Sequence, residues 1–262
     1  MPGRLLPSFA IGLAMLLSGC AGLLGGKQPV SIAESTRPTL PGQGTFTVQK
    51  GRPGLVIGAP HGTTDSATDT IGADLARLTG FSAVIARGFG KLDADGRRYN
   101  VNRPTEGVPG TPPSGEKESA EARRVFEGYD RSVTEAAQGP LRYYVEVHGN
   151  AHKETAGRVE IATMGISTDE AWRLKALLEL VRDAHLRSQP DAPRLDILVG
   201  PVDALRYTAS QAKAGGLFAR SEKAIHIELP RVARTTYREI YTAMLADFLR
   251  QSADLLASSK GR

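Results

Sequence analysis

Short apolar runs alternate with amphipathic segments along most of this chain. The runs are typical of buried strands and lie at residues 55–59, 82–86, 141–147, 158–162, 196–199 and 224–228. Apolar residues at helical spacing predict helices at 66–79, 116–137, 169–187 and 235–256. Residues 88–115 carry glycines, prolines and an Asp-Gly pair, which predict a long loop. Strands that alternate with helices predict an α/β fold, a three-layer α/β/α domain with a largely parallel mixed sheet.

The first twenty residues have the pattern of an export signal. Arg4 precedes an apolar run from Phe9 to Leu17, which is too short to span a membrane as a stable helix. The sequence Leu17-Ser18-Gly19-Cys20 resembles the bacterial lipobox, in which cleavage precedes a cysteine that is then lipidated. The resemblance implies a signal peptide over 1–19 and a lipid anchor at Cys20. A secretory signal with a chance cysteine is the alternative.

This N-terminus predicts where the protein resides and how its chain is divided. The chain would be exported and lipid-anchored to the cell envelope, at the outer membrane facing the periplasm in a Gram-negative cell. Residues 20–45 are rich in Gly, Pro, Ser and Thr, which predicts that the lipidated cysteine is followed by a flexible tether. Residues 46–262 would form one folded domain.

The composition excludes several classes of protein. Of 262 residues, 40% are hydrophobic and 23% charged, as in ordinary globular chains, and a single cysteine cannot build a disulfide scaffold. The net charge of +5 is mild, and no Lys/Arg block follows the pattern of a nucleic-acid interface. We therefore expect no nucleic-acid partner.

Polar residues follow three of the predicted strands. His61 and Asp65 come after the first strand, His148 ends the strand at 141–147, and Glu228 ends the strand at 224–228. Open α/β sheets bind ligands beyond the carboxyl ends of their strands. Two histidines and a carboxylate can hold Zn²⁺ and leave a position for water, and a further carboxylate can move the proton.

The order of these residues resembles the zinc carboxypeptidase superfamily, closest to its N-formylglutamate amidohydrolase and poly-γ-glutamate hydrolase branches. The resemblance covers about residues 55–250. The positions that carry it are His61 with Asp65, Arg87, Asn102-Arg103, His148 and Glu228.

Carried over position by position, the resemblance implies a zinc-dependent hydrolase of an amide bond. His61, Asp65 and His148 would bind Zn²⁺, and metal-activated water would attack the carbonyl while Glu228 moves the proton. Asn102 and Arg103 would bind a carboxylate of an amide or peptide substrate. Arg87 would stabilise the oxyanion or add to carboxylate binding.

Other interpretations of these residues remain open. Asp69 is an alternative acidic ligand, because the carboxypeptidases space their first histidine and acid differently. Asp65 is also a suitable helix cap, and Glu228 a suitable buried partner for Arg231 or Arg234. His226 shares a strand face with Glu228, and we expect a buried structural role for it, as we expect a loop position for His152. The alternative function is a non-catalytic, lipid-anchored binding protein for acidic ligands.

Overall fold

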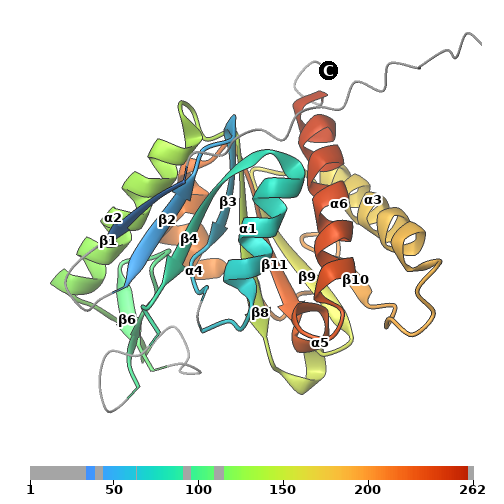
Figure 1. The fold of residues 1–262 in the computed structure, drawn as a ribbon, viewed down its shortest axis with the longest axis horizontal. Coiled ribbons are helices and arrows are strands. Elements are labelled where there is room, and N and C mark those ends of the chain that lie inside the picture. The colour runs from blue at the N-terminus through green and yellow to red at the C-terminus, as the bar shows by residue number, and fades with distance from the viewer. Residues whose placement is uncertain (1–33, 39–43, 63, 91–95, 109–114, 259–262) are drawn as a thin grey trace, which may run out of the picture.

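A computed structural model describes residues 34–38, 44–62, 64–90, 96–108 and 115–258 of this chain. The predicted signal peptide and Cys20 lie outside the described residues. The described part is built around one sheet of eight strands in the order β1-β2-β4-β3-β8-β11-β9-β10 (Figure 1). Its strands are β1 (Glu34–Pro38), β2 (Thr45–Gln49), β3 (Arg52–Ala59), β4 (Phe81–Arg87), β8 (Tyr143–Asn150), β9 (Arg158–Met164), β10 (Asp196–Val199) and β11 (Lys223–Pro230).

The centre of the sheet is parallel. Strands β4, β3, β8 and β11 run in the same direction, and β10 is parallel to β9. Strands β1 and β2 on one side, and β9 on the other, join by antiparallel pairs. The predicted α/β fold with a largely parallel mixed sheet is confirmed.

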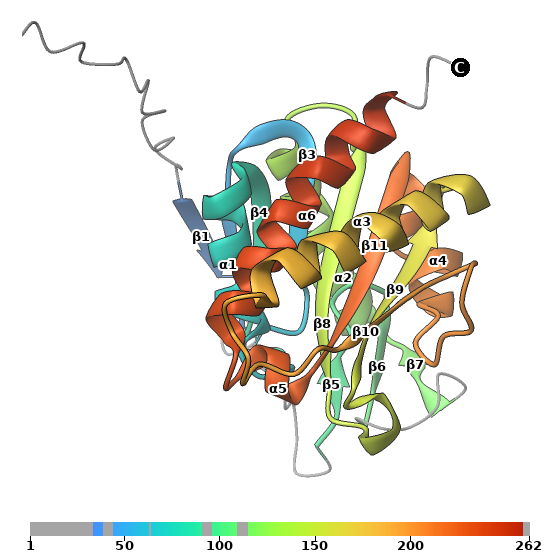
Figure 2. The ribbon, with the colours of Figure 1, turned by 90° about the vertical axis from the view of Figure 1, so that its right-hand side faces the viewer.

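Helices cover both faces of this sheet. Helices α1 (Thr68–Thr79), α3 (Thr168–Leu186) and α6 (Arg238–Ser258) pack on one face, where their apolar residues meet Ile57, Val145 and Ile227 (Figure 2). Helix α2 (Ala120–Ala137) packs on the opposite face, with the short α4 (Ser210–Gly215) and the 3₁₀ helix η3 (Leu217–Arg220). Because side chains alternate along a strand, Tyr144 and Ala224 face α2 while their neighbours face α6.

Local signals in the sequence explain where the long helices begin and end. The Ser167 hydroxyl accepts from the Glu170 N–H and the Glu170 carboxylate accepts from the Ser167 N–H, which caps α3 on its first turn. The Ser119 hydroxyl accepts from the Ala122 N–H at the start of α2. Helix α1 ends at Gly80, whose φ of 72° is left-handed and favours glycine.

Two regions differ from the predicted elements. Strand β1 lies within the segment predicted as a tether, and β2 begins at the last residue of that segment. The region predicted as loop at 88–115 contributes to a second, small antiparallel sheet made of β5 (Arg98–Tyr99), β6 (Thr105–Gly107) and β7 (Lys117–Glu118). These strands are too short to leave a periodic pattern.

The remaining elements lie near the carboxyl ends of the central strands. They are the 3₁₀ helix η2 (Lys153–Thr155) after β8 and helix α5 (Arg231–Arg234) after β11. Strands β3, β8 and β11 are parallel, so the residues that follow them gather at one edge of the sheet. No helix in the described ranges is long and apolar enough to cross a membrane.

Candidate metal centre

The turn after β3 brings Asp65 back over His61. The backbone N–H groups of Thr64 and Asp65 both donate to the His61 carbonyl, at 3.0 and 2.8 Å. Gly62 allows this turn, because a Cβ there would lie 2.5 Å from the Ala86 carbonyl oxygen. The distance from His61 Nδ1 to Asp65 Oδ2 is 3.3 Å.

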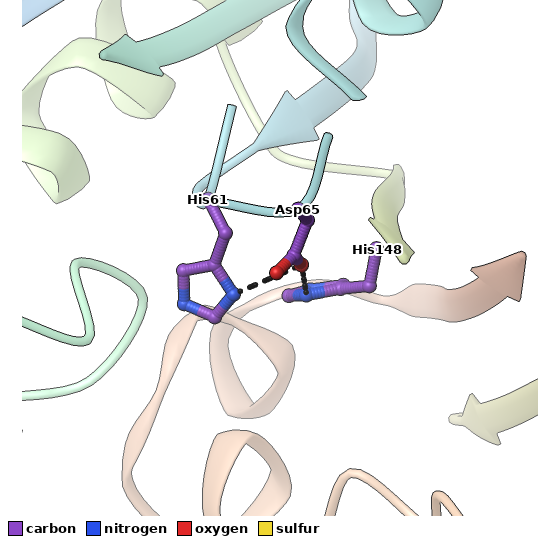
Figure 3. A group of neighbouring side chains, drawn as sticks. All are labelled: His61, Asp65 and His148. Carbon is purple, nitrogen blue, oxygen red and sulfur yellow. Dashed lines mark hydrogen bonds and ion pairs between the residues drawn. The ribbon is translucent and has the colours of Figure 1, made fainter. Parts of the chain in front are cut away.

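Strand β8 supplies the second histidine to the same point. His148 is buried, and its Nδ1 lies 3.5 Å from Asp65 Oδ2. Figure 3 shows the Asp65 carboxylate between the two imidazole rings. The backbone N–H of Gly149 also donates to Asp65 Oδ2, at 3.3 Å. The structure thus brings His61, Asp65 and His148 together, with one potential ligand atom of each within 4.8 Å of the others.

Hydrogen bonds on the far side of each ring fix which nitrogen is available to a metal. His61 Nε2 lies 3.1 Å from the Asn100 carbonyl, and His148 Nε2 lies 3.0 Å from Glu146 Oε2. Each Nδ1 faces Asp65 Oδ2, where a metal ion could take the place of a proton; the carbonyl and the carboxylate at the two Nε2 atoms only accept, so a proton on each Nε2 satisfies them. In a neutral ring this leaves the Nδ1 lone pair unprotonated. Two such nitrogens and one carboxylate oxygen are a donor set that fits a divalent metal ion.

The electrostatics of the three residues are strongly coupled. Burial raises the pKa of Asp65, but the neighbouring His61 and His148 outweigh this and hold it well below its usual range. Burial lowers the pKa of His148, but hydrogen bonds to Asp65 and Glu146 outweigh this and raise it to about 10. For His61 burial dominates, and its pKa is lowered. The pair therefore combines one imidazole that favours the neutral form with one that is protonated at neutral pH.

Glu228 lies beside His148 on the neighbouring strand. The two residues are paired in the parallel register of β8 and β11, so their side chains share a face of the sheet. Glu228 Oε1 lies 3.1 Å from His226 Nε2, and Asn150 Nδ2 donates to Oε2 at 3.4 Å. Glu228, His61, Asp65 and His148 all line one cavity of about 770 Å³.

Arg87 is not among the residues that line this cavity, and its role in catalysis stays a prediction. Arg87 ends β4, and its Nε donates to Asp69 Oδ2 at 2.9 Å. Neither residue is among those that line the cavity. The structure therefore brings Asp65, and not Asp69, to the histidines.

Asn102 and Arg103 line the cavity, but both have partners within the protein. Asn102 Nδ2 donates to Glu146 Oε2 at 3.0 Å. The Arg103 guanidinium binds the Glu116 carboxylate through two hydrogen bonds, of 2.9 and 2.5 Å. Their binding of a substrate carboxylate, which the resemblance implied, stays a prediction, and in the structure Glu116 already occupies the Arg103 guanidinium.

Glu146 was not predicted from the sequence, whereas His226 is buried as expected. Glu146, His148 and His226 form a second group with potential ligand atoms within 4.8 Å of one another. The period of two along a strand is the signal that identifies them, since Glu146 precedes His148 by two residues and His226 precedes Glu228 by two. His152 and Tyr207 also line the cavity.

The fold and site define an α/β protein with a candidate metal centre at the edge of its sheet. No protein-family model and no curated protein sequence matches this chain.

Among solved structures, the fold is similar to that of a bacteriophage poly-gamma-glutamate hydrolase, with 13% identity, a TM-score of 0.46, and coverage of 84% of this chain and 93% of that chain. It is also similar to zinc-free YNDL, with 13% identity, a TM-score of 0.47, and coverage of 87% and 94%. A metallo-carboxypeptidase from Burkholderia cenocepacia shows 11% identity, a TM-score of 0.47, and coverage of 88% and 67%. All three similarities are distant.

Proposed function

We propose that this chain is a zinc-dependent hydrolase of an amide bond in a carboxylate-bearing substrate, with zinc held by His61, Asp65 and His148. The observation that carries this proposal is the orientation of the two rings. Each Nε2 is held by an acceptor, while each Nδ1 faces the same Asp65 oxygen. Two imidazole nitrogens and a carboxylate suit Zn²⁺, and three protein ligands leave a position for catalysis.

The chemistry that zinc supplies at such a site is polarisation of a carbonyl and activation of water near neutral pH. The residues of this chain would position the substrate and move the proton. Glu228 is the carboxylate beside His148 in the same cavity, so we assign to it the general-base and general-acid role. His226 and Asn150 contact its two oxygens and would hold the carboxylate in one orientation.

A cation in the cavity would bind the carboxylate of the substrate. Three arginines line it, and two of them already have carboxylate partners, Arg103 with Glu116 and Arg206 with Glu154. Arg98 donates only to the Thr64 hydroxyl, at 3.4 Å, and within the described ranges no carboxylate lies within 4 Å of it. We therefore assign substrate-carboxylate binding to Arg98 ahead of Arg103.

The place of action follows from the N-terminal sequence. The lipobox-like segment ending at Cys20 supports export and anchoring by lipid in the cell envelope. Peptides of the cell wall and γ-glutamyl polymers are carboxylate-bearing amides that an exported protein would meet. Labelling cells with a radioactive fatty acid tests the anchor, because Cys20→Ala should abolish incorporation.

The metal assignment is tested by zinc content and affinity. We expect about one zinc per purified wild-type chain, and loss of stoichiometric zinc in His61→Ala and His148→Ala. His152→Ala is the matched control, because His152 lines the same cavity away from the three ligand atoms. Retention of wild-type zinc by both ligand variants would refute the assignment.

The catalytic assignment needs a separate test. Glu228→Gln should keep its zinc but lose most of its hydrolytic activity. The activity is measured as amine released from a panel of N-acyl amino acids, γ-glutamyl peptides and wall-derived peptides. General acid–base groups contribute about 10²- to 10⁴-fold. Full activity of this variant would contradict the role of Glu228. A zinc-loaded wild type that binds acidic peptides without hydrolysing any of them would instead identify a binding protein.

A further inference from the structure

Glu146 is a wholly buried carboxylate behind the candidate metal centre. It lies in the middle of β8 with no exposed surface and faces the α2 side of the sheet, as His148 does. A buried carboxylate is costly unless hydrogen bonds or charges compensate it. Burial raises the pKa of Glu146, but the hydrogen bond with His148 and the neighbouring His226 outweigh this and hold it well below its usual range.

Hydrogen bonds hold both oxygens of Glu146. The Tyr144 hydroxyl donates to Oε1 at 3.1 Å, and the Tyr129 hydroxyl lies 3.2 Å behind that of Tyr144. On the other side, Asn102 Nδ2 and His148 Nε2 each lie 3.0 Å from Oε2. The carboxylate therefore has little freedom to rotate, and it presents a fixed acceptor to the His148 ring.

The neighbouring strand leaves room for this arrangement. A Cβ at Gly58 on β3 would lie 2.5 Å from the hydroxyl oxygens of both Tyr129 and Tyr144. The absence of a side chain at Gly58 thus allows the two hydroxyls to meet beneath Glu146.

His226 completes the surroundings of His148. In the parallel register of β8 and β11, Glu146 is paired with His226 and His148 is paired with Glu228. Acids and imidazoles therefore alternate both along each strand and across the two strands. The rings of His148 and His226 stack with centroids 4.1 Å apart, and His226 Nδ1 lies 3.6 Å from Glu146 Oε2. His148 therefore cannot turn away from Asp65 without breaking its contact with Glu146 and displacing a packed ring.

We propose that Glu146 is a positioning residue that, supported by Tyr144, fixes the His148 ring with Nδ1 directed at the metal position. The expected consequence, tighter zinc binding, rests on the proposed function. The contact between Glu146 and His148 does not depend on it. Outer hydrogen-bond partners of a ligating histidine set its tautomer and orientation, and their loss weakens metal binding by about 10- to 100-fold.

The first experiment measures zinc affinity by competition with a chromophoric chelator. We expect Glu146→Gln to raise the zinc Kd by about 10- to 100-fold. Tyr144→Phe removes one donor without altering the charge, so we expect a smaller rise, and this variant keeps the test valid if Glu146→Gln fails to fold. Glu160→Gln is the matched control, because Glu160 is a buried strand carboxylate that binds Arg158 and two backbone N–H groups instead of a ligand histidine.

A role in folding alone would lower the unfolding temperature of the metal-free variants and leave the zinc Kd unchanged, which would overturn the proposal. In that case Glu160→Gln would show the same zinc Kd as Glu146→Gln and Tyr144→Phe.

The second experiment tests the contact without metal. In ¹H–¹⁵N spectra of the metal-free protein, we expect a slowly exchanging His148 Nε2–H signal, identified by its absence in His148→Gln. It should be lost in Glu146→Leu, which removes the acceptor, and retained in Glu160→Leu. Persistence of the signal in Glu146→Leu overturns the proposal. If the wild type shows the signal but takes up no zinc, the proposed function fails while the positioning contact stands.

Discussion

Arg234 connects the three segments that carry the site, and its removal should loosen all of them. The guanidinium is buried. It donates from Nε to the Leu229 carbonyl at 3.1 Å and from Nη2 to the Asn150 carbonyl at 3.0 Å. Its Nη1 also donates to the carbonyl of Ser66. These carbonyls lie at the ends of β11 and β8 and in the turn before α1. We therefore expect Arg234→Met to destabilise the fold at the site.

The magnitude follows from the burial of the three hydrogen bonds. Two of them are fully buried, and the Ser66 carbonyl lies near solvent, where water can replace the lost donor. Leaving a buried acceptor without a donor costs about 1–3 kcal/mol. Methionine fills part of the volume, and the cost of burying the guanidinium disappears. We expect a net loss of about 2–4 kcal/mol, or an unfolding temperature lower by roughly 10 °C for a domain of this size.

Urea unfolding in the presence of a chelator measures this loss without a contribution from bound metal. Arg231→Met is the matched control, because Arg231 belongs to the same short helix but is exposed. We expect the control to lie within about 0.5 kcal/mol of the wild type. A loss below about 1 kcal/mol for Arg234→Met, or equal losses for the two variants, would refute the reasoning.

Three further outcomes follow from the site. Arg98→Ala should weaken inhibition by glutarate at least tenfold, whereas Arg103→Ala should lower stability with little effect on inhibition; the reverse order would contradict the assignment of Arg98. Because the pKa of His148 is raised to about 10, zinc must displace a proton, so its Kd should rise roughly tenfold for each pH unit below that value. Calorimetry in two buffers should show proton release, and a Kd independent of pH between about 7 and 9 would exclude this competition. Gly62→Ala should cost about 1–3 kcal/mol in urea unfolding, because the added Cβ meets the Ala86 carbonyl; wild-type stability would show that the turn can shift.

Six strands of the large sheet and the four long helices could be predicted from the sequence, because the strands are short apolar runs and the helices have a clear period; β2 was not predicted. The apolar run at 55–59 lies within β3, and the helical pattern at 169–187 is shifted by one residue from α3. Strand β1 could not be predicted, since it is a short, polar edge strand whose partner, β2, is what defines it. The small second sheet is likewise defined by tertiary pairing and not by local pattern.

The convergence of His61, Asp65 and His148 could be predicted because strand ends in a parallel sheet share an edge. The partners of Arg87 and Arg103 could not. A guanidinium on a long side chain reaches many acceptors, and here Asp69 in α1 and Glu116 before β7 are the ones that the fold supplies. The sequence does not show that Arg87 lies near Asp69 or Arg103 near Glu116. No local pattern in these segments indicates which side chains will meet in the fold.

The negative charges around His148 attract a cation, whether a proton or the proposed metal ion. Asp65 faces its Nδ1, Glu146 its Nε2, and Glu228 lies beside it on the next strand, so three carboxylates surround one imidazole. Without metal, protonation of His148 offsets one of these charges, which explains its raised pKa. A divalent metal ion held by Nδ1 would replace that single charge by two, and the Nε2–H would still donate to Glu146. The same carboxylates would attract both the proton and the proposed metal ion, so the zinc affinity at neutral pH would be set by the difference between the two.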